Sequence, residues 1–166
     1  MTTALVIYLG SAFVALIITP VVIRIAPRIG AVDRPGVRTV HERPIPRIGG
    51  VAIFLAAMTL IVSVLWLDNA IGEAFRARRL PMTTLLCSAT FIFLIGLVDD
   101  LRGLPARIKF GAELVAALAL CAAGIRIENI GLTGEFSLDL GYAGWLLTVL
   151  WVVGITNAVN LSDGLD

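Results

Sequence analysis

Five long apolar runs divide the chain, and they constrain its fold more than any other feature of the sequence. A helix needs about 20 mostly apolar residues to cross a bilayer, and the runs cover residues 4–26, 49–67, 82–98, 108–124 and 143–161. The third and fourth runs are short, so we expect their helices to extend into the flanking polar residues. The sequence predicts an all-α integral membrane protein, a polytopic bundle of about five transmembrane helices in a single transmembrane domain, residues 1–166.

Composition supports this class. Hydrophobic residues make up 58% of the chain and charged residues 15%, whereas soluble domains are typically about 45–50% apolar and about 25% charged. The chain has no basic run interleaved with aromatic residues, so we expect no nucleic-acid partner. Cys87 and Cys121 lie inside apolar runs, and we predict buried free thiols rather than a disulfide or a metal site.

The loops between the runs predict an orientation in the membrane. Successive spans alternate direction, so loops 27–47 and 99–107 share one side with the C-terminal tail, and loops 68–81 and 125–142 share the other. Loop 27–47 carries five arginines, whereas loop 125–142 carries one arginine against three acidic residues. The positive-inside rule then places loops 27–47 and 99–107 in the cytoplasm and the N-terminus outside. The three arginines of loop 68–81 do not fit this orientation. Alternating apolar residues in loop 125–142 indicate a small β-hairpin.

The first polar cluster lies in loop 27–47 and combines arginines with prolines. Arg38 and Arg47 suit phosphate oxygens, because the guanidinium fork binds them through two hydrogen bonds. His41 is the only histidine, which argues against a zinc site. The alternative is a basic loop that sets topology and touches anionic head groups.

The second cluster is the carboxylate pair Asp99 and Asp100 at the end of the third run. Adjacent carboxylates repel one another, and a divalent cation beside them would keep both ionised. The pair could also supply a general base or be a solvated helix end. Lys109 lies near the start of the fourth run, where a cation opposes the helix dipole, and this favours a phosphate contact. We expect Glu113, inside the fourth run, to pair with Lys109 at i, i+4.

The third cluster ends the fifth run. Its members, spaced three apart, are Asn157, Asn160, Asp163 and Asp166. This spacing places successive members near one face if the helix continues. Amide groups can fix a sugar, a uracil or a metal-bound water, and carboxylates add acceptors for a metal or for hydroxyls. A helix cap or turn is the structural alternative.

Taken together, the three clusters resemble the polyprenyl-phosphate N-acetylhexosamine-1-phosphate transferase superfamily, and within it the UDP-GlcNAc-type branch. Three motifs in this order on one side of the membrane make the resemblance specific. The matching stretches are Asp33-Arg-Pro through Arg47-x-Gly-Gly, Gly-Leu-Val-Asp99-Asp100, and Asn157-x-x-Asn160-x-x-Asp163-Gly-x-Asp166. The resemblance implies transfer of GlcNAc-1-phosphate from a UDP-sugar to a polyprenyl phosphate, usually undecaprenyl phosphate, with release of UMP. It places the reaction at the cytoplasmic face of the bacterial inner membrane, as the first membrane step of cell-surface glycan assembly.

The resemblance also implies roles for individual residues. Asp99 and Asp100 would be catalytic, with Asp99 as the base for the lipid phosphate. Magnesium, with manganese as the alternative, would bind Asp100 and Asp163. The implied substrate-binding residues are Asp33, Arg38, His41, Arg47, Lys109, Asn157, Asn160 and Asp166.

Members of that superfamily are longer and carry further acidic and histidine-containing motifs. We therefore expect this sequence to be the amino-terminal half of a longer enzyme and to be inactive alone. The remaining half of the enzyme and a second copy of the chain, in a homodimer, are further candidate partners. A non-catalytic membrane subunit and a cation-binding transporter fragment are the competing functions. Transporter sites tend to lie near the membrane midplane, whereas these carboxylates lie at span ends, and this favours an enzyme.

Overall fold

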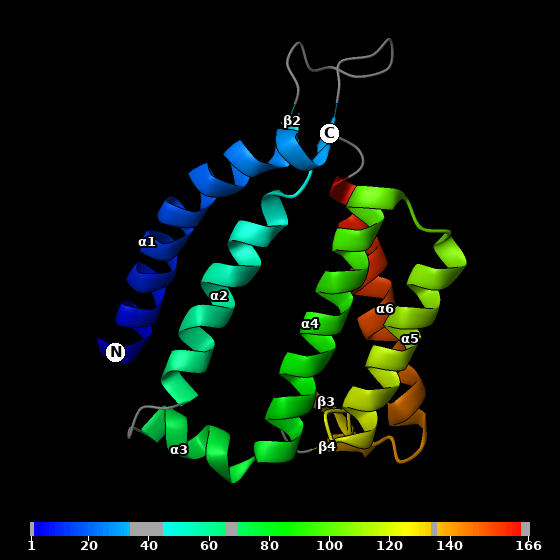
Figure 1. The fold of residues 1–166 in the computed structure, drawn as a ribbon. Coiled ribbons are helices and arrows are strands. Elements are labelled where there is room, and N and C mark those ends of the chain that lie inside the picture. Colours follow the sequence, from blue (N-terminus) through cyan, green and yellow to red (C-terminus); the bar gives the residue numbers. More distant parts are fainter. Residues whose placement is uncertain (1, 34–44, 66–69, 134–135, 164–166) are drawn as a thin grey trace. The chain divides into compact units, whose positions relative to one another are not determined.

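The computed structural model describes residues 2–33, 45–65, 70–133 and 136–163, and helices form most of this part of the chain (Figure 1). The helices are α1 (Thr2–Ile25), η1 (Ala26–Ile29, a 3₁₀ helix), α2 (Gly49–Leu65), α3 (Ala70–Ala77), α4 (Arg79–Arg102), α5 (Ala106–Ala122) and α6 (Ala143–Asp163). Two antiparallel pairs of strands complete the fold, β1 (Val32–Asp33) with β2 (Ile45–Pro46), and β3 (Asn129–Thr133) with β4 (Phe136–Asp139). The all-α polytopic class is confirmed, and so is the hairpin expected in loop 125–142.

The number of spans differs from the prediction of about five. Within the described ranges, three helices are long and apolar enough to cross a membrane alone, at Leu5–Ile29, Arg79–Arg102 and Ala143–Leu161. A fourth arises if α2 and α3, which lie at 90° to each other, are counted as one bent span. Helix α5 has only 17 residues, fewer than the roughly 20 that a bilayer requires. The fourth predicted span, residues 108–124, therefore forms a helix but does not meet the length criterion.

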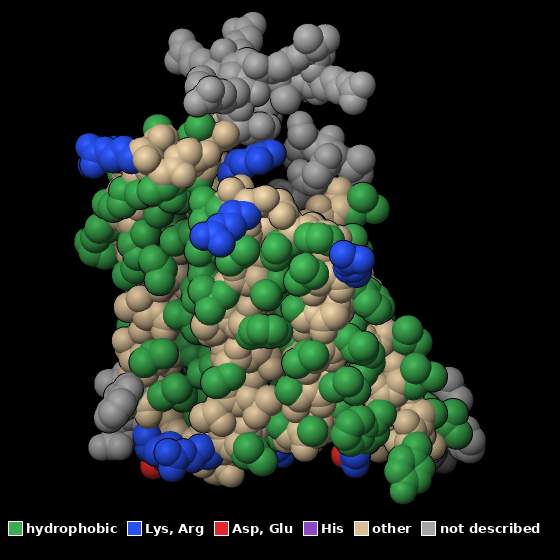
Figure 2. All heavy atoms as spheres, turned by 45° about the vertical axis from the view of Figure 1, so that its right-hand side comes forward, with side chains coloured by type: hydrophobic (Ala, Val, Ile, Leu, Met, Phe, Trp, Pro, Cys, Tyr) green, Lys and Arg blue, Asp and Glu red, His purple; other side chains and the backbone are tan. Residues whose placement is uncertain are grey.

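The surfaces of these helices carry large apolar side chains. On α1, Val6, Leu9, Phe13 and Leu16 are all more than half exposed. Soluble proteins rarely expose contiguous apolar patches of this kind, whereas hydrocarbon tails cover them in a membrane. In Figure 2 the visible lysine and arginine side chains lie near the ends of the helices, and hydrophobic and uncharged side chains fill the band between them.

Two helix boundaries differ from the predicted loops. The segment predicted as loop 68–81 contains helix α3 and the start of α4. Pro81 is tolerated in α4 because it falls in the first turn, where the missing N–H of a proline costs no helical hydrogen bond. The guanidinium of Arg76 on α3 donates a hydrogen bond of 3.2 Å to the carbonyl of Leu65, the last residue of α2. This contact satisfies a carbonyl that the helix end leaves without an intrahelical donor, so one of the arginines of loop 68–81 has a structural role.

Packing divides the chain into two compact units, residues 1–77 with 97–103, and residues 78–96 with 104–166. The single transmembrane domain stays a prediction. In the first unit α1 packs on α2 in antiparallel order. The buried residues Ala52 and Ala56 lie one turn apart on α2, and a β-carbon placed on Gly10 of α1 would lie 2.9 Å from Leu60. Small residues therefore let these two helices approach closely.

In the second unit α5 packs on α6, also in antiparallel order. The buried residues of α5 recur with helical periodicity and form one face, Ala112, Glu113, Ala116, Ala117, Leu120 and Cys121. At the start of α6 the backbone approaches the segment before β3 so closely that a β-carbon on Gly144 would lie 2.2 Å from the carbonyl oxygen of Ile127. Only glycine fits at that position.

The cysteine prediction is half right. Both thiols are free, but only Cys121 is buried, whereas Cys87 on α4 is exposed. Cys87 lies on the side of α4 that lines a groove of about 330 Å³ against α5, together with Thr84 and Phe91. An apolar run therefore located the helix but did not tell which of its residues pack inside the unit.

Candidate functional site

The carboxylate pair forms the last turn of α4. The helix ends at Arg102, and Gly103 adopts a left-handed conformation with φ of 69°, which lets its N–H donate to the carbonyl of Asp99 at 2.8 Å. Asp99 and Asp100 thus lie at the negative end of the helix dipole, where carboxylates are unfavourable. Such a placement costs stability unless positive charge lies nearby.

Leu97 fixes this helix end within the first unit. Its side chain packs against an apolar cluster at the end of α1 and the start of α2, made of Val22, Ala26, Ala31, Ile48 and Ala52. The backbone N–H of Arg47 donates to the carbonyl of Ala31 at 2.9 Å, next to this cluster. The turn that carries both carboxylates therefore lies beside the two ends of loop 27–47, as the shared side of loops 27–47 and 99–107 predicted.

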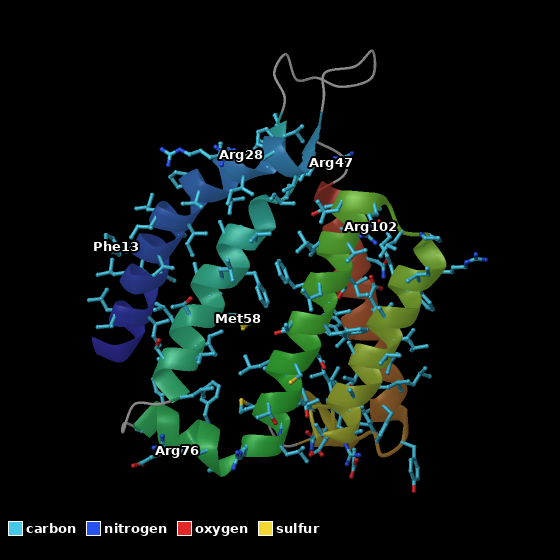
Figure 3. The ribbon with its side chains drawn as sticks, viewed as in Figure 1. Phe13, Arg28, Arg47, Met58, Arg76 and Arg102 are labelled. Atoms are coloured by element: carbon cyan, nitrogen blue, oxygen red, sulfur yellow. The ribbon has the colours of Figure 1, made fainter. Side chains whose placement is uncertain are left out.

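The arginines of the first unit are distributed unevenly between the two ends of its helices. Arg28, Arg47 and Arg102 lie at one end of its helices, and Arg76 lies at the opposite end (Figure 3). Arg47 is exposed. Positive side chains gathered beside two carboxylates are an arrangement that can hold phosphate and a cation together.

The rest of the first cluster is only partly described. Asp33 pairs with Ile45 in the register of β1 and β2, and these short strands join the two ends of the loop. Arg38 and His41 lie outside the described residues. Their roles stay predictions.

Asp99 and Asp100 have different surroundings. Successive residues on an α-helix point about 100° apart, and Asp99 is half-buried whereas Asp100 is exposed. Among the described residues no group of three or more histidine, cysteine or acidic side chains could hold a metal ion. Mg²⁺ nevertheless binds proteins through one or two carboxylates together with substrate phosphates and waters, and the pair fits that mode.

The second unit gathers another part of the predicted site. Lys109 lies in the first turns of α5, and Glu113 follows one turn later. Glu113 is 6% exposed, and its carboxylate accepts a hydrogen bond from the side-chain amide of Asn157 on α6. The contact that the structure shows for Glu113 is therefore not the predicted i, i+4 ion pair with Lys109, which stays a prediction. The antiparallel packing of α5 and α6 offers the buried carboxylate an amide donor from the neighbouring helix instead.

The third cluster lies at the end of α6. Asn157 and Asn160 are both exposed and one turn apart, so the predicted shared helical face exists for these two residues. Asp163 is the last residue of α6, which confirms that the helix continues that far. Asp166 lies outside the described residues.

Two residues that sequence reasoning missed hold α6 in place at its other end. Thr148 is buried, and its hydroxyl accepts a hydrogen bond of 2.8 Å from the N–H of Ile127 and donates one of 2.6 Å to the carbonyl of Gly144. Gly144 permits the close approach that these bonds require. Their spacing of four residues on an apolar helix was the only signal in the sequence, and it is common in membrane helices.

Comparison with known proteins assigns the family. The family model described as glycosyl transferase family 4 matches residues 82–166, more than half of the chain. The chain belongs to glycosyl transferase family 4. The match begins in α4 and includes the carboxylate pair, Lys109 and the asparagines of α6. No solved structure matches the chain.

Among the curated relatives, a probable undecaprenyl-phosphate N-acetylglucosaminyl 1-phosphate transferase of Bacillus subtilis is 41% identical over 169 residues, which cover 100% of this chain and 44% of the relative. A decaprenyl-phosphate N-acetylglucosaminephosphotransferase of Mycobacterium tuberculosis is 34% identical over 95% of this chain and 39% of its own length. An undecaprenyl-phosphate alpha-N-acetylglucosaminyl 1-phosphate transferase of Yersinia pestis is 28% identical over 86% of this chain and 37% of its own length. The chain thus spans less than half the length of these relatives.

Proposed function

We propose that the protein transfers GlcNAc-1-phosphate from UDP-GlcNAc to a polyprenyl phosphate, with undecaprenyl phosphate as the acceptor and UMP as the leaving product. An oxygen of the lipid phosphate would form a bond to the phosphorus that carries the sugar, and the pyrophosphate bond to UMP would break. The names of the relatives support the reaction class. The observation that carries the proposal is the packing of Leu97, which brings Asp99 and Asp100 beside the ends of the arginine-rich loop.

The predicted site residues would each have a separate role in the phosphoryl transfer. Such reactions depend on positioning and on neutralising phosphate charge more than on covalent help from the protein. Arg47 and Lys109 would bind phosphate oxygens, and the half-buried Asp99 would act as the base for the acceptor phosphate. Asp100 and Asp163 would hold Mg²⁺, which when bound neutralises charge on the phosphates.

The orientation follows the arginines. We place the site at the cytoplasmic face of the bacterial inner membrane, with the N-terminus outside. Arg28, Arg47 and Arg102 gather at one end of the first unit (Figure 3), as the positive-inside rule requires of a cytoplasmic end. There, a lipid acceptor can arrive from the bilayer while a soluble nucleotide sugar arrives from water.

The test is an exchange assay on membranes that contain the protein expressed from its complete gene. Labelled UMP should enter UDP-GlcNAc in the presence of undecaprenyl phosphate and Mg²⁺. Asp99→Asn should lower the exchange rate by about 100-fold or more, because the acceptor phosphate loses its base. Asp139→Asn is the matched control, since Asp139 lies on the hairpin, where its Oδ1 accepts from Gly141 and an amide oxygen can do the same. Absence of exchange in the unaltered protein, or equal loss in both variants, would contradict the proposal.

A further inference from the structure

The feature that the proposed roles leave unused is the buried carboxylate of Glu113. It lies on the face of α5 that packs inside the second unit, among alanines, and is 6% exposed. A carboxylate removed from water is costly unless hydrogen bonds compensate it. The bond that it accepts comes from Asn157, 44 residues later in the chain and on a different helix.

Both amide protons of Asn157 are used inside the protein. Its Nδ2 donates to the carboxylate of Glu113 and, at 2.9 Å, to the carbonyl oxygen of Val153 in the preceding turn. This fixes which end of the amide points inward, because a rotated amide would bring Oδ1 against the Val153 carbonyl, which can only accept. Among the described contacts, Oδ1 of Asn157 receives no donor.

The oxygen left over can meet a ligand where the side chain is accessible. The residue Asn157 is exposed although its nitrogen is engaged. An amide oxygen can only accept hydrogen bonds or coordinate a cation. The chemistry that this side chain recognises is therefore an electropositive group, either an N–H or O–H donor or a metal ion.

The pair also ties together the end of the helix pair that carries the predicted ligands. The other end of α6 is held by Thr148, which accepts from Ile127. The Glu113–Asn157 bond fixes the end that continues to Asn160 and Asp163. Without it, Asn157 would keep only the bond to Val153 of its own helix, and none of the described side-chain contacts would join this end of α6 to another helix.

We propose that Glu113 is a positioning residue that orients Asn157, so that Oδ1 meets an electropositive group of the bound substrate or its metal ion. The inference rests on the proposed function, and it adds a residue that acts through another residue rather than on the ligand. The electropositive group is either a donor of the nucleotide sugar or the divalent cation.

The test exchanges donor and acceptor within the pair. Asn157→Asp places two carboxylates against each other and should lower exchange by about tenfold or more, because the amide donor is lost. Adding Glu113→Gln to this variant restores a bond with reversed polarity, with the glutamine nitrogen donating and an oxygen of the new carboxylate still facing the ligand. The double variant should recover part of the lost rate, because the bond to the Val153 carbonyl stays lost.

Two single variants separate positioning from structure. Glu113→Gln keeps an oxygen acceptor for Asn157 and should leave the kinetic constants within about threefold of the unaltered protein. Glu113→Met keeps the length of the side chain but removes the acceptor, and should raise one apparent constant by about tenfold. A rise in KM for UDP-GlcNAc identifies the nucleotide sugar as the partner of Oδ1, and a rise in the half-saturating Mg²⁺ concentration identifies the cation. Rates are expressed per folded protein, with the unfolding midpoint measured alongside.

The outcomes distinguish the two proposals. If the unaltered protein exchanges UMP but Glu113→Met changes only the unfolding midpoint, Glu113 is structural and the inference is overturned alone. Failure of the double variant to exceed Asn157→Asp overturns it as well. If the unaltered protein shows no exchange, the proposed function is overturned and the inference with it.

Discussion

The two helix pairs of the molecule are held together in different ways. Between α1 and α2 the contacts involve alanines and the approach of Gly10 to a leucine side chain, and no polar bond joins the two helices among the described residues. Between α5 and α6 similar alanine packing is supplemented by the bond from Asn157 to Glu113 and by the bond from the following segment to Thr148. One pair depends on shape, and the other on shape and polar contacts together.

The difference has a consequence for where a site can be built. Apolar packing between membrane helices rests on van der Waals contacts of small residues and involves no directional bond. A hydrogen bond is directional and loses strength steeply when its geometry changes. The side chains that bind substrate need a fixed position, and the polar contacts occur on the helix that carries Asn157 and Asn160. Three substitutions test this comparison, beginning with the largest expected effect.

Gly144→Ala should be the most damaging change. A β-carbon there would lie 2.2 Å from the carbonyl oxygen of Ile127, and backbone cannot move aside as a side chain can. We expect a loss of about 3 kcal/mol in the free energy of unfolding, the upper range for overpacking. Far-UV circular dichroism during denaturation in detergent measures it. Gly154→Ala on the same helix is the matched control, since nothing lies within 4 Å of its β-carbon position. Equal effects at the two glycines would show that the close approach is not a constraint.

Thr148→Val should have an intermediate effect. Valine has nearly the same shape, but it leaves the N–H of Ile127 without the acceptor that the threonine hydroxyl provides at 2.8 Å. We expect a loss of about 1–2 kcal/mol in the same measurement. The control is Thr156→Val, because that hydroxyl only donates to the carbonyl of Val152 in its own helix. If both valine substitutions lower the free energy of unfolding by the same amount, polar contacts do not distinguish this helix pair.

Gly10→Ala should have the smallest effect. The added carbon would lie 2.9 Å from a methyl carbon of Leu60, and this flexible side chain can rotate away. Alanine is also favoured over glycine within a helix by up to about 1 kcal/mol. The two contributions should leave the free energy of unfolding within about 0.5 kcal/mol of the original. A loss as large as that at Gly144 would mean that the α1–α2 contact is as rigid as the α5–α6 contact, and the comparison would fail.

Much of the fold could be predicted from the sequence, because apolar length and loop composition act locally. The runs located the helices, and alternating residues located the hairpin of β3 and β4. The predictions that differ from the structure concern segments in which charged residues interrupt or shorten an apolar run. Helix α5 contains Arg107, Lys109 and Glu113 and is short, and loop 68–81 contains an amphipathic turn of helix that no long apolar run marks.

The candidate site was predictable in its parts and less so in its contacts. The carboxylate pair and the asparagines could be found because polar groups at the ends of apolar runs are costly without a function. The partner of Glu113 could not be found in this way. Lys109 stands one turn away in the sequence, and helical spacing favours it, whereas Asn157 comes from a helix whose register on α5 no local pattern specifies.

The sequence by itself determined the class of the protein, its helices and its family motifs, because hydrophobic length and charge distribution need no knowledge of packing. Only the tertiary structure decided that Leu97 holds the carboxylate turn beside loop 27–47, that Gly144 and Thr148 bring α6 against the segment before the hairpin, and that the buried carboxylate of Glu113 accepts a hydrogen bond from Asn157. These contacts depend on which faces of two helices meet and in which register. The energy that selects them arises only when both helices are in place.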